Sequence, residues 1–205
     1  DRYLLDVIER YAFCPYSKEG RKAGATKRFV HYADSSSLEP FLDLIERASE
    51  SGVAVIQVIL PLLDIDANAF RRFCIEVTAL GNARLGEPVF AVAPLHPGLD
   101  FGHGAHAMVP LFRRAPDPTI QWVRLDGLDA IYKGRESDDH FVPPEEMMDY
   151  LEANPKGKPR LYDRICETNA MMARRLGVER VVEMLAEIST EARERYMRVL
   201  LSDES

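Results

Sequence analysis

The sequence predicts an α/β domain, in which helices cover a small sheet of about four strands and a helical third follows at the C-terminal end. Three observations lead to this prediction. Apolar, β-branched runs of strand length stand between segments whose apolar residues recur at helical spacing. Strands and helices alternate along the chain, which is typical of a mainly parallel or mixed sheet with helices packed on it. From about residue 144 onward the spacing is helical alone.

The first part of the chain alternates helix and strand. Pro15 ends the first helix, because its ring cannot continue a helix, and one of the serines at 35–37 caps the second. The run Val53–Leu60 is almost continuously apolar between Gly52 and Pro61, which predicts a buried strand covered on both faces. The expected elements are, in order, a helix over 3–13, a loop over 17–28, a strand over 28–33, a helix up to about 48 and a strand over 53–60.

The remaining elements follow from the same signals. Asp64 or Asp66 caps the next helix, which ends near Gly86. Residues 96–118 are rich in Gly and Pro and lack periodicity, and a connection this long is usually functional or disordered. Gly177 and Thr190 are the expected stop and cap of late helices. The other expected elements are strands over 89–95 and 119–125, an exposed excursion over 133–144, and helices over about 144–152, 160–176, 178–188 and 190–201.

Length and composition fit one domain over residues 1–205, with a helical part over 144–201. The net charge of −7 argues against non-specific nucleic-acid binding, because a phosphate backbone attracts clustered Lys and Arg. We expect no membrane partner, because no apolar run approaches the roughly 20 residues of a membrane helix and no signal peptide opens the chain. An odd, sparse set of cysteines favours a reducing compartment, so we expect a cytoplasmic protein. These cysteines are Cys14, Cys74 and Cys166.

The densest group of chemically active side chains follows the strand expected at 89–95. His96, Asp100, His103 and His106 lie there, and open α/β sheets hold ligands beyond the carboxyl ends of their strands. Imidazole is the commonest protein ligand of metals, and this set suits zinc or non-haem iron better than magnesium. Three interpretations stay open: a solvated surface loop, a metal site of His96, His103 and His106, or acid–base and substrate-binding histidines without a metal.

A second group, over residues 113–124, is rich in arginine. The guanidinium group presents a planar fork that fits a carboxylate or phosphate. Arg114 is placed to reach over the same cleft as the histidine loop, while Gln121 and Arg124 are expected on opposite faces of their strand. This group is either an anion clamp for a substrate or a set of ordinary surface salt bridges.

Two further candidates lie outside these groups. Cys14 and Tyr16 are expected to line the pocket, and Lys18, Arg21 and Lys22 would make the thiol more reactive. The Cys14-Pro15 pair resembles the single-thiol active site of glutaredoxins, although a helix precedes it here instead of a strand. Plain packing of Cys14 is the alternative. Asn169 lies on the apolar face of a predicted helix, where a buried amide either braces a loop or contacts a ligand.

Several short motifs together resemble a bacterial family described as domain of unknown function 1415, of which this chain would be a divergent member. The matching stretches are Cys14-Pro15-Tyr16-Ser17, His96-Pro97 with Phe101, residues 113–118 running into 121–124, and Asn169 before Leu176-Gly177. The family has Asn at the position of Arg113, His at that of Gln121 and Glu at that of Leu125. The resemblance supports the placement of the site and implies no reaction.

Together these residues predict an enzyme that acts on a small anionic molecule. His96, His103 and His106 would act as catalytic groups or hold zinc or iron, and Arg114 and Arg124 would bind a carboxylate or phosphate of the substrate. Two other classes stay open. One is a thiol redox protein that uses Cys14. The other is a non-catalytic module whose helical end packs against a partner or a second copy through its methionines, namely Met147, Met148, Met171, Met172 and Met184.

Overall fold

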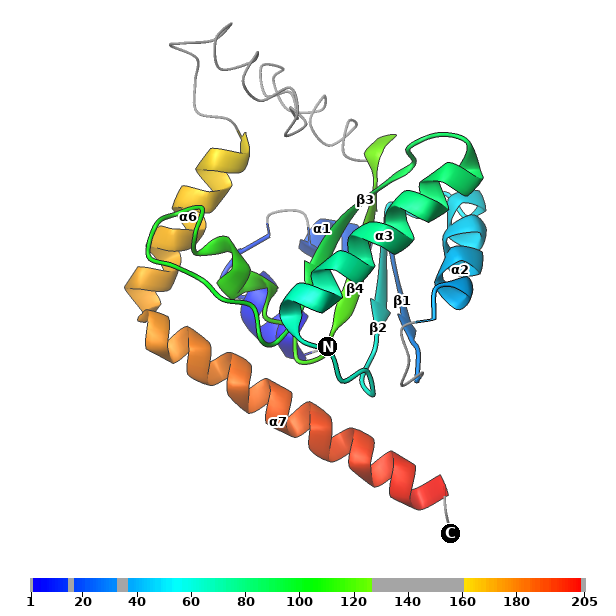
Figure 1. Cartoon of the computed structure of the whole chain (residues 1–205). Coiled ribbons are helices and arrows are strands. Elements are labelled where there is room, and N and C mark those ends of the chain that lie inside the picture. The colour runs from blue at the N-terminus through cyan, green and yellow to red at the C-terminus, as the bar shows by residue number, and fades with distance from the viewer. Residues whose placement is uncertain (1, 15–16, 33–36, 127–160, 204–205) are drawn as a thin grey trace, which may run out of the picture.

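The computed structural model describes residues 2–14, 17–32, 37–126 and 161–203 (Figure 1). It confirms the α/β class, with a mixed sheet, helices packed on it and two helices at the C-terminal end. The helical elements are η1 (Tyr3–Glu9), α1 (Ser17–Lys22), α2 (Glu39–Glu50), α3 (Ala67–Leu85), η2 (Val109–Arg113), α6 (Leu161–Leu176) and α7 (Val178–Asp203). The strands are β1 (Thr26–Val30), β2 (Val55–Ile59), β3 (Phe90–Leu95) and β4 (Thr119–Arg124).

The described residues form a four-stranded sheet in the order β1-β2-β4-β3. β1 and β2 run parallel, whereas β4 runs antiparallel to both of its neighbours, so the sheet is mixed. Gln57 of β2 stands opposite Arg28 of β1 and Gln121 of β4. This register places one polar side chain at the same level on each of three adjacent strands.

α2 and α3 cover one face of the sheet and enclose the main core with it (Figure 1). Ile56 and Val58 of β2 and Trp122 of β4 point into this core and are almost fully buried. The indole N–H of Trp122 donates to the hydroxyl of Thr78 on α3, at 2.9 Å, so the one polar group of this ring is satisfied. The opposite face of β2 is half-buried, which differs from the expected strand covered on both faces.

α3 has the two end signals expected from the sequence. The carboxylate of Asp66 accepts hydrogen bonds from the backbone N–H groups of Asn68 and Ala69, both at 3.0 Å, which satisfies donors that the helix leaves free. At the other end Gly86 has φ +79°, a left-handed conformation that favours glycine. Of the two predicted caps, Asp66 is therefore the one used.

A second apolar cluster joins the two ends of the chain. η1 contributes Val7 and Ile8, which pack with residues of α6 and α7 that lie more than 150 positions later. Phe13 and Phe112 stack in this cluster with ring centroids 4.3 Å apart. The members of the cluster are Val7, Ile8, Phe13, Met108, Leu111, Phe112, Ala170, Ala173, Val181, Leu185 and Ile188.

Several expected boundaries were wrong. Residues 17–22 form α1 instead of a loop, and the strand begins earlier, at Thr26. Leu38 stands at the start of α2 without a side-chain cap, and Pro40 in the first turn favours the helix there instead. Thr190 does not begin a new helix, because its hydroxyl donates to the carbonyl of Ala186 within a continuous α7. The excursion at 133–144 and the helix at 144–152 lie outside the described residues.

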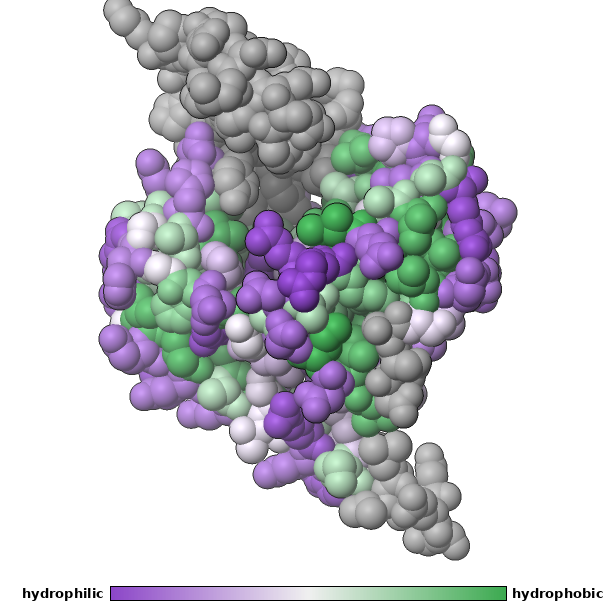
Figure 2. All heavy atoms as spheres, viewed as in Figure 1, coloured by the Kyte–Doolittle hydropathy of each residue, from purple (hydrophilic) through white to green (hydrophobic). Residues whose placement is uncertain are grey.

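Polar and apolar residues are interspersed over the face that carries α3 (Figure 2). Ile75 and Leu80 of α3 are among the apolar residues that remain about half exposed. Among the described helices, none combines the length and the apolar composition that crossing a membrane requires.

Candidate functional site

His96 is a buried residue, with 6% of its surface exposed, and both of its ring nitrogens are used. Nε2 lies 3.0 Å from the carbonyl oxygen of Ile65 and donates to it, while Nδ1 accepts from the backbone N–H of Gly98, also at 3.0 Å. The ring packs against Phe70 of α3, with centroids 5.5 Å apart. Burial lowers the pKa of this imidazole and favours the neutral ring. His96 therefore fastens the end of β3 to the segment before α3, and neither nitrogen is available to a metal.

The structure does not bring the three predicted histidines together. His103 is exposed, and its backbone carbonyl accepts from the guanidinium of Arg174 on α6. His106 is also exposed, and its Nε2 lies 3.3 Å from a carboxylate oxygen of Asp163. Within the described part of the chain, no three His, Cys, Asp or Glu side chains are grouped closely enough to hold a metal ion. The arrangement of His96, His103 and His106 does not fit a three-histidine centre.

The side chain of Arg114 reaches the segment that carries the histidines, as the sequence suggests, but it contacts the backbone and a ring of that segment. Its Nε donates to the carbonyl of Leu99 at 2.6 Å, and its guanidinium lies 4.8 Å from the centre of the Phe101 ring. The backbone N–H of His96 also donates to the carbonyl of Arg113. These contacts join the two ends of the connection over residues 96–118 to each other.

Arg124 lies at the wrong end of the sheet for the predicted clamp. It stands opposite Phe90, the first residue of β3, whereas His96 follows the last residue of that strand. Its guanidinium pairs with Asp126 at 2.8 Å and donates to the carbonyl of Ser49. The distance arises because β4 runs antiparallel to β3, so the end of β4 meets the start of β3.

Gln121 belongs to a row of polar side chains across three strands. Nε of Arg28 donates to Oε1 of Gln57 at 3.0 Å, and Nε2 of Gln57 donates to Oε1 of Gln121 at 2.7 Å. The row lies on the half-buried face of the sheet, opposite α2 and α3. Gln121 and Arg124 thus lie on opposite faces of β4, as expected from their odd spacing.

Asn169 braces a loop, which is one of its two predicted roles. Its amide donates to the carbonyl of Phe13 at 2.8 Å, and its side chain is buried. Cys14 is half-buried and packs at the margin of the second apolar cluster. Tyr16, the other predicted lining residue, lies outside the described residues.

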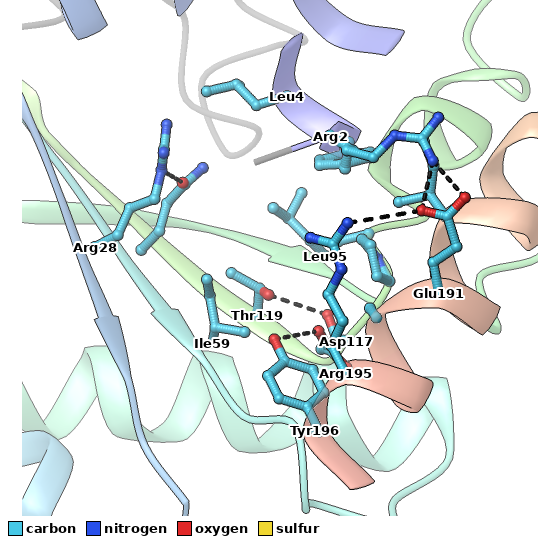
Figure 3. Close-up of a pocket in the computed structure, with 16 residues that line it drawn as sticks. Arg2, Leu4, Arg28, Ile59, Leu95, Asp117, Thr119, Glu191, Arg195 and Tyr196 are labelled. Carbon is cyan, nitrogen blue, oxygen red and sulfur yellow. Dashed lines mark hydrogen bonds and ion pairs between the residues drawn. The ribbon is translucent and has the colours of Figure 1, made fainter. Parts of the chain in front are cut away.

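A hollow with a cavity volume of about 130 Å³ lies on the half-buried face of the sheet, between its strands, η1 and α7 (Figure 3). Ile59 and Leu95, the last residues of β2 and β3, line it. The hollow therefore lies at the same edge of the sheet as the site expected from the sequence. The residues differ because side chains alternate along a strand, so Leu95 faces the hollow while His96 faces α3. The polar residues that line the hollow are Arg2, Tyr3, Arg28, Gln57, Asp117, Thr119, Glu191, Arg195 and Tyr196.

A buried acid lies in the wall of this hollow. Asp117 is 7% exposed, and one of its carboxylate oxygens, Oδ2, accepts from the hydroxyl of Tyr196 on α7 at 3.2 Å (Figure 3). Pro118 follows it and restricts its backbone to extended conformations, while the hydrogen bond to Tyr196 orients its carboxylate. Among the described residues, Tyr196 is the one hydrogen-bond donor to this carboxylate.

The acid and its partner both have shifted pKa values. Burial raises the pKa of Asp117, while the hydrogen bond from Tyr196 and the charge of Arg193 oppose this shift. Burial and the neighbouring carboxylate raise the pKa of Tyr196 to about 12. The tyrosine thus stays protonated as a donor, and the carboxyl group titrates closer to neutral pH than an ordinary aspartate.

Arginines stand on two sides of the hollow. Arg28 of β1 lies on one side, and Arg195 of α7 lies on the other (Figure 3). The carboxylate of Glu191 pairs with the guanidinium group of Arg2 and lies 4.0 Å from that of Arg195. Burial lowers the pKa of the Arg28 guanidinium, which indicates a cation that has lost part of its hydration. The lining of the hollow therefore includes a cationic side chain on the sheet and another on α7.

Sequence reasoning missed most of this site. Gln57 offered a signal, because it is the one polar residue within the apolar run of β2. Asp117 stood among the arginine-rich residues, yet nothing in the sequence indicates that it is buried. Tyr196 and Arg195 read as ordinary positions of a helix, because their partners lie on distant elements.

No family model, no curated protein and no solved structure matches the chain, so the resemblance to domain of unknown function 1415 stays a prediction.

Proposed function

We propose that this chain is an enzyme that binds a small anionic molecule in the hollow beside α7, with Asp117 as the group that exchanges a proton with it. The buried carboxylate of Asp117 in the wall of a cavity is the observation that carries this proposal. A titratable group with a raised pKa in a cavity is a common feature of acid–base sites. Asp117 meets this description, with Tyr196 holding its orientation.

The charges around the hollow support an anionic ligand. Arg28 and Arg195 present guanidinium groups from opposite sides, and such groups bind carboxylates and phosphates well. The proposal keeps the substrate class expected from the sequence and moves the site from the histidine loop to the hollow. It does not require His96, His103 and His106 to share an ion.

The binding step is tested by ligand-dependent thermal stability, since a molecule that binds only the folded chain raises its Tm. We expect inorganic phosphate or small carboxylates such as succinate to raise the Tm of the wild type. For Arg195→Ala and Arg28→Met, the ligand concentration that gives the same rise in Tm should be about tenfold higher or more. Arg180→Ala is the matched control, because Arg180 is an exposed arginine of α7 that pairs with Glu183 and does not line the hollow. If the ligand raised the Tm of all three variants equally at the same concentration, the proposal would be contradicted.

The catalytic step is tested on whichever probe binds. NMR spectra of the bound probe in deuterated buffer, followed over hours, should show deuterium incorporation or new resonances with the wild type and none with Asp117→Asn. Binding without any chemical change would favour the non-catalytic binding module instead.

A further inference from the structure

The strand ends beneath the hollow carry apolar side chains that belong to neither core of the chain. Thr119 of β4 stands between Ile59 of β2 and Leu95 of β3, and all three residues line the hollow (Figure 3). Ile59 and Leu95 lie outside both apolar clusters of the described residues. The hydroxyl of Thr119 donates to the backbone carbonyl of Asp117, so the one donor of this row is already used. The row therefore presents mainly carbon to the hollow.

η1 and α7 extend this apolar surface. Leu4 of η1 lines the hollow, and so do Ile188 and Ala192 of α7, which are four residues apart and lie on one face of that helix. Apolar side chains thus reach the hollow from the sheet, from η1 and from α7. Because removing apolar surface from water is favourable, an occupant with a carbon body binds here more tightly than a purely polar one.

Arg195 gives the hollow a cation on its exposed side. An α-helix turns by about 100° per residue, and while Tyr196 points to Asp117, Arg195 points towards Glu191 (Figure 3). The side chain of Arg195 is 63% exposed and lies 4.0 Å from Glu191, whose carboxylate pairs with Arg2. A carboxylate bound at Arg195 therefore stays in contact with solvent, and burial is left to the apolar part of the ligand.

The volume of the hollow bounds the size of that apolar part. A cavity of about 150 Å³ holds benzene, and this hollow has a volume of about 130 Å³. An apolar group of about four or five carbon atoms therefore fits.

We propose that the ligand is a small monocarboxylate with a short, unsubstituted carbon chain, such as butyrate or 3-methylbutyrate. Its carboxylate meets Arg195, and its chain packs between the strand ends at Ile59 and Leu95 and the face of α7 that carries Ala192. This inference rests on the proposed function and names its substrate class. It predicts that affinity follows the length of the carbon chain, which an anion site without an apolar part does not require.

The test is a series of carboxylates that differ only in their carbon chain. Acetate, propionate, butyrate and 3-methylbutyrate are titrated into the full chain, and dissociation constants are measured from NMR chemical shifts. Each added carbon should tighten binding to the wild type about fourfold, as expected for the burial of one methylene group. Ala192→Leu places an isobutyl group in the hollow, so 3-methylbutyrate should keep less than about a fivefold advantage over acetate. Ala186→Leu is the matched control, because Ala186 is exposed on the same helix and does not line the hollow.

The other outcomes separate this inference from the proposed function. Equal binding of all four acids to the wild type would overturn the inference and leave the anionic site standing. A chain-length effect that is the same in Ala192→Leu and in the wild type would also overturn it, because the chain would then bind elsewhere. Butylamine has the chain of butyrate with a cationic end, and its binding as tightly as butyrate would remove the anionic site as well. Binding of none of the acids would likewise remove both.

A second variant keeps the test decisive if Ala192→Leu does not fold. Leu4→Ala enlarges the hollow from the side of η1. Hexanoate should then gain affinity relative to butyrate, compared with the same ratio in the wild type, and an unchanged ratio would overturn the inference.

Discussion

At the scale of single residues, the chemistry of this chain lies with side chains whose partners are distant in sequence. Asp117 and Tyr196 are 79 positions apart, yet their hydrogen bond forms one wall of the hollow. His96 shows the converse, since it stands in the most conspicuous motif of the sequence and has a structural role. A motif gives residue types, but the direction of a side chain depends on the strand that carries it.

Replacing Asp117 by Asn should change how stability depends on pH. Burial raises the pKa of Asp117 in the folded state, so the folded chain binds this proton more tightly than the unfolded chain. The contribution of Asp117 to stability is therefore fully present below its ordinary pKa and is lost as the pH rises through the raised value. We expect Asp117→Asn to gain stability relative to the wild type between pH 4 and pH 8, measured as the difference in free energy of unfolding in urea.

The comparison at two pH values separates this effect from a general change in packing. A difference between the two proteins that is the same at pH 4 and at pH 8 would contradict the raised pKa. Thr119→Val serves as a control, because it removes a hydrogen bond to the backbone carbonyl of Asp117 and adds no titratable group.

At the scale of elements, α2 and α3 meet at a point where only glycine fits. A methyl group on Gly81 of α3 would meet the side chain of Ile45 on α2, with Cγ2 at 3.0 Å and Cδ1 closer still. Ile45 has no exposed surface and lies in the main core, where close packing leaves little space for a side chain to shift. This contact sets how closely the two helices approach over the sheet.

Gly81→Ala should therefore destabilise the fold by about 1–3 kcal/mol through overpacking, although alanine favours a helix interior over glycine by about 0.5–1 kcal/mol. Ile45→Val removes Cδ1, the atom that the new methyl group would meet first. In urea unfolding, the double variant should lose less stability than the two single variants together. Additive losses would mean that the helices separate without strain and that the close approach has no energetic importance.

The elements also show which parts of the fold the sequence predicts. The runs that became β2, β3 and β4, and the two ends of α3, are local patterns of apolar spacing and capping, so they were found within a few residues. The order of the strands and the antiparallel direction of β4 depend on pairing between distant segments, which no local pattern contains. The hollow was missed for the same reason, because Arg28, Asp117 and Tyr196 come from three separate elements.

At the scale of the whole molecule, the described contacts that hold α7 are apolar packing, the hydrogen bond from Tyr196 to Asp117, and the exposed ion pair of Arg2 and Glu191. Val181 and Leu185 are buried in the cluster shared with η1 and α6, whereas Arg2 and Glu191 are both nearly half exposed. Exposed ion pairs contribute little, because solvent screens them and the side chains lose freedom. The apolar contacts therefore set how firmly α7 closes the hollow.

We expect Leu185→Ala to lower the free energy of unfolding by about 2–5 kcal/mol, as for other buried leucines. A double-mutant cycle of Arg2→Ala and Glu191→Ala should give a coupling within the error of the measurement, and the same value in high salt. A strong, salt-sensitive coupling would show instead that the ion pair holds α7 against η1.

The cluster that joins both ends of the chain has a consequence for biosynthesis. Val7 and Ile8 leave the ribosome more than 170 residues before Val181 and Leu185, with which they share a buried cluster. The nascent chain therefore carries an uncovered apolar segment while the intervening residues are synthesised, and chaperones that recognise such segments have that interval in which to bind it.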